Sequence, residues 1–187
     1  RMGATMVDMM LATNDPRVPF YCAEDANGGY SGSPIGSETT DASRPGSYIA
    51  AESASSPIIS YAELKFIEAE ARFMTTGAAS AQAAYEAAVA ASVLKVTGSA
   101  NTAWLDANIN GVTVTLDLIM TQKYFATFGT NQAYADYRRT GLPVIVPHPQ
   151  GLLPAMPTRF PYAQDEITYN GANTPSVLIS DKLWWDQ

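Results

Sequence analysis

Apolar and polar residues alternate with a helical period at the start of the chain. Four methionines between Met2 and Met10 recur at this spacing, with valine and leucine positions between them. The pattern stops at the turn-prone run Asn14-Asp15-Pro16. The spacing predicts a helix over residues 2–12.

The clearest helix pattern follows residue 57. Ser60, with Glu63 three residues later, forms a capping box, and Gly77 supplies a stop signal. The positions expected to face the core of this helix are Leu64, Ile67, Ala71 and Met74. A second helix follows after a very short turn, with Ser80 as its expected N-cap and nine alanines among residues 78–91. Such a short connection predicts an antiparallel helical hairpin.

A second pair of helices is predicted further along the chain. One covers about residues 115–128, with Leu116, Ile119, Met120 and Tyr124 on one face, and Gly129 ends it. Thr130 is the expected cap of the other, which ends with Arg138 and Arg139 at the negative end of its dipole. Two successive hairpins predict an all-α fold of tetratricopeptide-like stacked helix hairpins over residues 57–140.

The segments outside the hairpins differ in composition. Residues 14–56 are rich in Gly, Ser, Pro, Asn and Asp but also carry several aromatic residues, which a flexible linker does not need, so an ordered long loop region with a function is expected. Six of the twelve prolines fall between Pro143 and Pro161, where they disfavour helix and central strand. Residues 141–187 are therefore predicted to form an irregular closure with a proline-rich tail.

Composition excludes several classes of protein. With 187 residues, 47% of them hydrophobic, the chain is long enough to bury one sizeable core. The net charge of −7 makes nucleic acid an unfavourable partner. Polar residues interrupt every hydrophobic stretch before the roughly 18 to 20 apolar residues of a membrane-spanning helix. The single cysteine, Cys22, cannot form an intramolecular disulfide.

The usual catalytic and metal-binding patterns do not occur. The single histidine, His148, lies between two prolines and outside any nucleophile motif, and histidine pairs and cysteine clusters are excluded by count. Glu24, Asp25 and Asn27 beside two glycines weakly suggest a calcium loop, but a turn held by Asx side chains explains them better. Glu63, Glu68 and Glu70 share one helix and fit capping or surface roles better than catalysis. We therefore expect neither catalytic residues, metal nor cofactor.

Aromatic residues suggest a different kind of site. A sugar ring stacks on an aromatic plane through its C–H groups, and its hydroxyls bind to planar polar side chains. The candidate ligand-binding residues of the early loop region are Tyr21, Tyr30, Tyr48, Arg17, Asp25 and Asn27. The alternative is that these rings anchor the loop to the helices.

Several phrases of the sequence resemble one family. They are LATNDPRVPFY with the Gly29–Gly32 segment, ISYAELKFIEAEARF, QKYFATFGTNQAYADYRRTGLP, RFPYAQDE with Asn170 and Asn173 following, and the closing WWD. In this order they resemble the carboxy-terminal part of the SusD/RagB family, in its SusD-like branch. The resemblance covers nearly the whole chain, which would make residues 1–187 the carboxy-terminal part of a single SusD-like domain.

The resemblance implies a function as well as a fold. Family members are nutrient-binding lipoproteins at the outer surface of the outer membrane of Bacteroidota, and they pass oligosaccharides, or in some members peptides, to a SusC-like TonB-dependent transporter. Cys22 does not stand in a lipobox, so a lipid anchor is expected in an amino-terminal part that this sequence does not contain. We expect a non-enzymatic oligosaccharide-binding protein. The alternatives are a peptide-binding member, an α-helical glycoside hydrolase, and a structural lid that grips the transporter.

Overall fold

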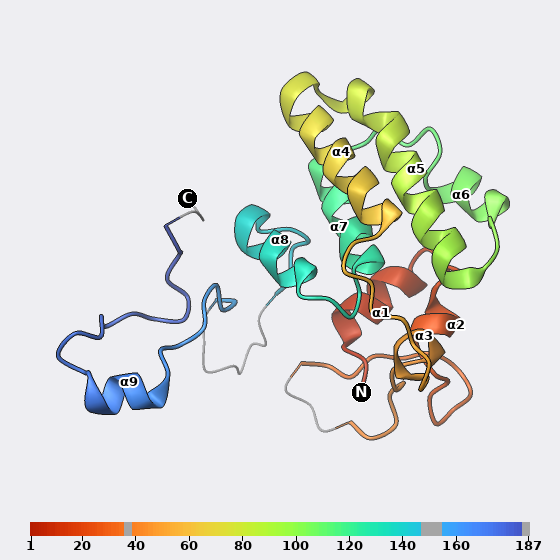
Figure 1. The fold of residues 1–187 in the computed structure, drawn as a ribbon. Coiled ribbons are helices and arrows are strands. Elements are labelled where there is room, and N and C mark those ends of the chain that lie inside the picture. Colours follow the sequence, from red (N-terminus) through yellow and green to blue (C-terminus); the bar gives the residue numbers. More distant parts are fainter. Residues whose placement is uncertain (36–38, 147–154, 185–187) are drawn as a thin grey trace. The chain divides into compact units, whose positions relative to one another are not determined.

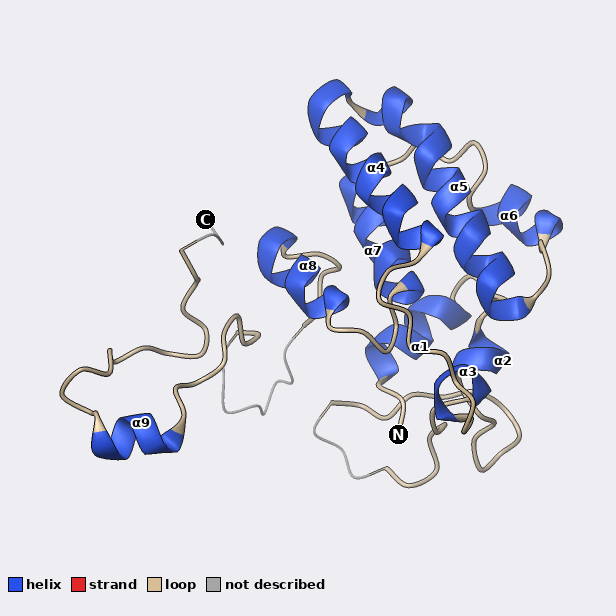
Figure 2. Ribbon diagram, in the orientation of Figure 1, coloured by secondary structure: helices blue, strands red, loops and turns tan. Residues whose placement is uncertain are grey.

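The computed structural model describes residues 1–35, 39–146 and 155–184. Over these ranges the regular structure is helical, which confirms the predicted all-α class, and two isolated bridges, Gly3 to Ser33 and Cys22 to Pro45, are the strand-like pairings there (Figures 1 and 2). The chain divides into two units, Arg1–Ala133 and Tyr134–Gln187. The helices are α1 (Ala4–Leu11), α2 (Val18–Tyr21), α3 (Ser47–Ala50), α4 (Tyr61–Thr76), α5 (Ala78–Thr97), α6 (Thr102–Asn108), α7 (Leu116–Ala126), α8 (Gln132–Thr140) and α9 (Gln164–Tyr169).

Helices α4 and α5 form the predicted antiparallel hairpin and lie side by side in the first unit (Figure 1). Ser60 Oγ accepts a hydrogen bond from the Glu63 N–H at 3.1 Å, so the expected cap of α4 is confirmed. The expected cap of α5 is wrong, because this helix begins at Ala78 and its N-cap is Gly77. Gly77 has φ +91°, a conformation that side chains disfavour, and it both ends α4 and begins α5. One residue therefore makes the whole turn.

The predicted core face of α4 is also wrong. Leu64, Ile67 and Met74 are 52%, 45% and 68% exposed, and Ala71 is exposed as well. The buried residues are Ala62, Phe66 and Ala69, on the side that packs against α5 and α7. Small side chains on this side let α4 approach the alanine-rich α5 closely, and the larger apolar side chains remain outside.

Both helices of the second predicted pair form, as α7 and α8. α7 begins after Thr115, whose Oγ1 accepts a hydrogen bond from the Leu118 N–H at 3.2 Å. Gly129 has φ +85° just beyond its end, and Thr130 Oγ1 accepts from the Gln132 N–H at 3.2 Å as α8 begins. α7 packs against both α4 and α5.

Within the described ranges, no helix is both long and apolar enough to cross a bilayer.

The early segment packs on the lower end of this stack (Figure 1). Residues 14–56 are mostly irregular, as predicted, and contain the short helices α2 and α3. They fold over one hydrophobic core cluster that joins α1 to α5 and α7. Its buried members are Met2, Met6, Val7, Met10, Val18, Tyr21, Cys22, Val96 and Phe125.

In the second unit, side chains and backbone groups interact within short segments. The Arg138 guanidinium lies over the Tyr134 ring at 4.5 Å, and Asp136 and Arg139 form an ion pair at 3.0 Å. Thr158 N–H donates to the Ile179 carbonyl at 2.8 Å. α9 lies inside the segment predicted to be irregular, and it has no buried residue. His148, for which no catalytic role is expected, lies outside the described residues.

Candidate functional site

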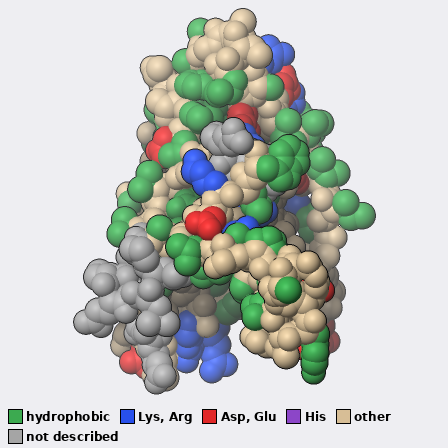
Figure 3. Space-filling model, turned by 90° about the vertical axis from the view of Figure 1, so that its left-hand side faces the viewer, with side chains coloured by type: hydrophobic (Ala, Val, Ile, Leu, Met, Phe, Trp, Pro, Cys, Tyr) green, Lys and Arg blue, Asp and Glu red, His purple; other side chains and the backbone are tan. Residues whose placement is uncertain are grey.

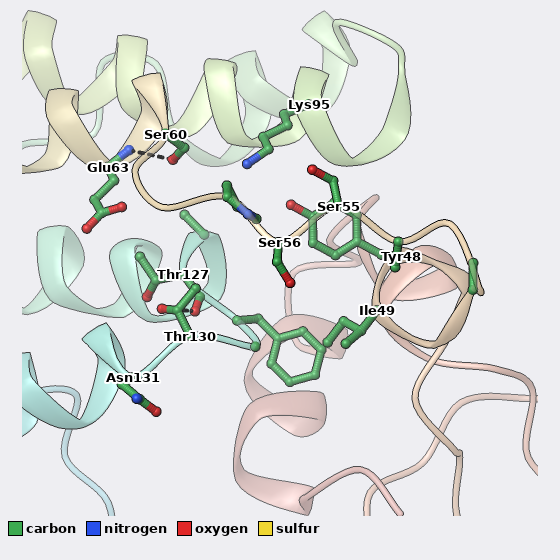
Figure 4. A pocket seen from close by; sticks show the side chains of 16 residues that line it. Tyr48, Ile49, Ser55, Ser56, Ser60, Glu63, Lys95, Thr127, Thr130 and Asn131 are labelled. Carbon is green, nitrogen blue, oxygen red and sulfur yellow. Dashed lines mark hydrogen bonds between the residues drawn. The ribbon is translucent and has the colours of Figure 1, made fainter.

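A pocket of about 390 Å³ opens in the first unit where three segments meet. The segments are α3 with the loop that follows it, the first turn of α4, and the end of α7, and one side chain from α5 completes the wall (Figure 4). The lining residues are Tyr48, Ile49, Ala51, Ala54, Ser55, Ser56, Pro57, Ser60, Glu63, Lys95, Ala126, Thr127, Phe128, Gly129, Thr130 and Asn131.

Three hydroxyl groups at the pocket hold its walls in place. Ser60 Oγ caps α4, as described above. Thr127 Oγ1 donates to the Lys123 carbonyl at 2.8 Å, and Thr130 Oγ1 donates to the Thr127 carbonyl at 2.8 Å. These bonds satisfy backbone groups at helix ends, so the three side chains shape the pocket and have little capacity left for a ligand.

Five polar side chains at the pocket have no partner within the described part of the chain. They are the two loop hydroxyls Ser55 and Ser56, the Glu63 carboxylate, the Lys95 ammonium and the Asn131 amide. Lys95 reaches down from α5, and Asn131 comes from the segment after α7 (Figure 4). The pocket thus offers an anion, a cation, an amide and two hydroxyls whose hydrogen bonds a bound molecule can complete.

Two aromatic rings, Tyr48 and Phe128, line the pocket, and a third ring supports them. Tyr21 packs edge-on against Tyr48 with ring centres 5.2 Å apart and against Phe128 at 5.0 Å. Its hydroxyl donates to the Phe125 carbonyl at 2.9 Å. Burial raises the pKa of Tyr21 well above its usual range, so the phenol stays neutral and remains a donor. Tyr21 therefore fixes both lining rings from below.

Two of the six predicted ligand-binding residues are wrong, because no ligand can reach them in this structure. Tyr21 and Arg17 are fully buried. The Arg17 guanidinium donates to both carboxylate oxygens of Asp15, to Ser92 Oγ at 3.0 Å and to Gln122 Oε1 at 2.7 Å. The loop that carries these residues folds back onto α5 and α7, so its polar and aromatic side chains serve the core. For Tyr21, the anchoring role that the sequence left open is the one found.

The other predicted residues divide between the pocket and a separate turn. Tyr48 lines the pocket. Asp25 accepts hydrogen bonds from the N–H groups of Asn27 at 2.8 Å and Gly29 at 3.1 Å, and from Ser31 Oγ at 2.7 Å. The bond from Ser31, followed by those from the two N–H groups, lowers the pKa of Asp25.

The hydrogen bonds of Asp25 confirm the Asx turn. Within the described ranges, no group of three or more His, Cys, Asp or Glu side chains is placed to hold a metal ion. Asn27 is exposed, and Tyr30 packs partly buried on the core cluster. Neither lines the pocket.

Most of the polar pocket residues have no recognisable signal in the sequence. Lys95 is the only cation in the alanine-rich helix α5, and that isolation was a usable signal. Ser55, Ser56 and Asn131 sit in turn-rich segments with no pattern of their own. Only the fold brings residues from 48–63, 95 and 126–131 together.

Comparison with known proteins agrees with the helical fold. No curated protein sequence matches the chain. Among solved structures, a chitin-binding protein is similar with a TM-score of 0.79 and 23% sequence identity, over 98% of this chain and 49% of that one. The chain therefore spans about half the length of this structural relative.

A family model matches the chain over residues 1–163. The model is SusD-like_2, and its description is "Starch-binding associating with outer membrane". The matched range contains both helical hairpins, the early loop region and every residue that lines the pocket. The chain belongs to the SusD-like_2 family.

Proposed function

We propose that this protein binds oligosaccharides in the pocket beside Tyr48 and releases them unchanged. One observation carries the proposal: two aromatic rings lie next to five polar side chains that have no partner among the described residues. A sugar has the matching pair of properties, because its C–H face packs on a ring while its hydroxyls both donate and accept hydrogen bonds. A purely apolar ligand would leave the polar groups unsatisfied.

The family and the structural relative support the same class of ligand. The family description speaks of starch binding, and the relative is called a chitin-binding protein. Starch and chitin are both polysaccharides, although their sugars and linkages differ. The ligand class we propose is therefore a glycan, with the particular sugar left to binding measurements.

The number of carboxylates at the pocket favours binding over hydrolysis. Glycosidases commonly use two carboxyl groups on opposite sides of the bond that is cleaved. Among the described residues, Glu63 supplies the one carboxylate of the lining. We propose that Glu63 accepts hydrogen bonds from sugar hydroxyls.

The place of action we propose is the surface of the outer membrane. The family description names association with the outer membrane. In this proposal the protein is a lipoprotein, and it passes its glycan to a SusC-like TonB-dependent transporter. Co-purification of that transporter with a tagged full-length protein from its own cells tests this part separately from ligand binding.

Titration calorimetry of the full-length protein tests the ligand class and the pocket together. Malto- and chito-oligosaccharides are the first ligands, and a mixture of short peptides tests the peptide-binding alternative. We expect Asn131→Ala to weaken glycan binding by about 5- to 10-fold, which corresponds to one lost hydrogen bond of ~1 kcal/mol. Lys95→Ala removes a charged donor, and its expected loss is about 10-fold or more.

Asn27→Ala is the matched control, because Asn27 is exposed and lies outside the pocket. A loss of affinity in this variant, with none in Asn131→Ala, would place the ligand on the early loop instead. Heat from peptides and none from glycans would favour the peptide-binding alternative. Release of reducing ends from a polysaccharide by the pure protein would show that it is an enzyme.

A further inference from the structure

The outer face of α4 carries large apolar side chains that nothing in the described structure covers. We define the outer stripe as Tyr61, Leu64, Ile67 and Met74, which follow one another at intervals of three or seven residues. At about 100° per residue these positions share one side of the helix. That side lies away from the buried face formed by Ala62, Phe66 and Ala69. Ile58 and Ile59, just before the helix, are exposed too.

A groove continues the outer stripe toward α5 and α6. It has a volume of about 650 Å³, and Tyr61 belongs to both features. Its other lining residues are Ala62, Ala87, Ala90, Ala91, Leu94, Lys95, Ala100, Thr102 and Leu105. Apart from Lys95 and Thr102, this lining is hydrocarbon and one phenol ring. Hydrophobic side chains also lie among charged ones on the part of the surface formed by the helical stack in Figure 3.

The form of the groove suits a helix better than a small ligand. Ala87, Ala90, Ala91 and Leu94 recur along α5 at helical spacing, and alanine lets another helix axis come close. In stacked helical hairpins, each hairpin has two faces to cover and a neighbouring hairpin covers the second one. The inner face of α4 is covered by α5 and α7, whereas its outer stripe is bare.

The comparison with the structural relative indicates what covers this surface. Nearly the whole of this chain superposes on that structure, yet it accounts for only 49% of it. We propose that the outer stripe and the groove seat a helix pair from the half of the SusD-like fold that this chain does not contain, carried by the same polypeptide. The proposal rests on family membership and the exposed face, and it is independent of the ligand.

Cysteine labelling of the full-length protein, produced from its complete coding sequence, tests the proposal. Ile67→Cys places a thiol in the outer stripe, and Ala107→Cys places one on an exposed position of α6 outside the groove lining. Native Cys22 is buried, so it adds little background, and the parent protein measures that background. We expect Ile67→Cys to react with a maleimide at least about tenfold more slowly than Ala107→Cys, with equal rates in denaturant, because labelling then requires local opening.

Several results would overturn the proposal. Equal native labelling rates for the two cysteines would show that the outer stripe faces water. Protection that disappears on dilution, together with a dimer in light scattering, would assign the surface to a second copy. A coding sequence without a further half of the fold would remove the proposed occupant. Leu64→Cys repeats the measurement if Ile67→Cys fails to fold by circular dichroism, and glycan is omitted throughout so that the result does not depend on the binding proposal.

Discussion

Arg17 joins three segments of the first unit through its guanidinium. The group pairs with Asp15 in the turn after α1, with Ser92 on α5 and with Gln122 on α7, and it also lies over the Phe125 ring at 5.6 Å. The side chains of both Arg17 and Asp15 are fully buried. Arg17→Met keeps the length and the apolar stem of the side chain but removes all of these bonds.

The expected loss of stability follows from what is left behind. Without Arg17, the Asp15 carboxylate stays in the interior and keeps one hydrogen bond, from the backbone N–H of residue 17 at 2.9 Å. Breaking a buried ion pair in this way costs about 3–5 kcal/mol of the free energy of unfolding. Since the free energy of unfolding of a whole domain is about 5–15 kcal/mol, Arg17→Met is expected to unfold at a much lower urea concentration.

Urea unfolding of four variants measures the effect. Asp15→Asn with Arg17→Met should lose less than the sum of the single changes, because asparagine keeps the acceptor for the backbone N–H without burying a charge. Arg72→Met removes an exposed ion pair with Glu68 and should change little. A loss of less than ~1 kcal/mol in the unfolding free energy of Arg17→Met would show that the buried pair contributes little. Additive losses in the double variant would show that Asp15 and Arg17 do not interact.

Three further predictions concern other parts of the fold. Tyr21→Phe should lower the free energy of unfolding by about 1–2 kcal/mol, because the Phe125 carbonyl loses its donor. Glycan affinity measured by calorimetry should not change in this variant, because the ring remains. Tyr21→Ala should lower both the stability and the glycan affinity. Gly77→Ala should cost about 1–3 kcal/mol in thermal unfolding, since alanine disfavours φ +91°, whereas Gly3→Ala, at φ −76° with open space around it, should not. Burial raises the pKa of Tyr85 from 10.0 to about 12. Between pH 10 and 12 the phenol of Tyr85 is therefore ionised in the unfolded chain but still protonated in the folded one, so the folded state loses stability as the pH rises. The urea concentration at the unfolding midpoint should fall over this range, and it should fall less steeply in Tyr85→Phe.

The starts of α4 and α7 were predictable because their capping signals are local, whereas the short helices α2, α3, α6 and α9 form in segments for which no helix was predicted. Ser60 and Thr115 cap through groups three residues away, so a short stretch of sequence contains both partners of each bond. The choice of the buried face of α4 is not local. Apolar residues occupy both sides of this helix, and the alanine-rich surface of α5 selects the side with Ala62 and Ala69.

Of the six candidate ligand-binding residues, one, Tyr48, lies at the pocket that we propose as the site. Aromatic residues in the early loop suggested a sugar-binding surface, and one of them, Tyr48, lines the pocket. Arg17 and Tyr21 were misplaced because a polar or aromatic side chain in a loop reads as exposed, although it can also supply the interior of a core built from short helices. Lys95 and Asn131 are brought to Tyr48 by tertiary packing, which no single window of the sequence contains.

Tyr21 packs against the two pocket rings, Tyr48 and Phe128, and so joins them to the interior. We therefore expect the rings and the polar side chains of the pocket to tolerate substitution differently. Replacement of either ring disturbs the interior, whereas Ser55, Ser56 and Asn131 have no partner in the part of the chain that the structure describes and can vary at little structural cost. A library randomised at these three positions should therefore yield folded proteins with altered sugar preference, while libraries at the rings should mostly yield unstable ones.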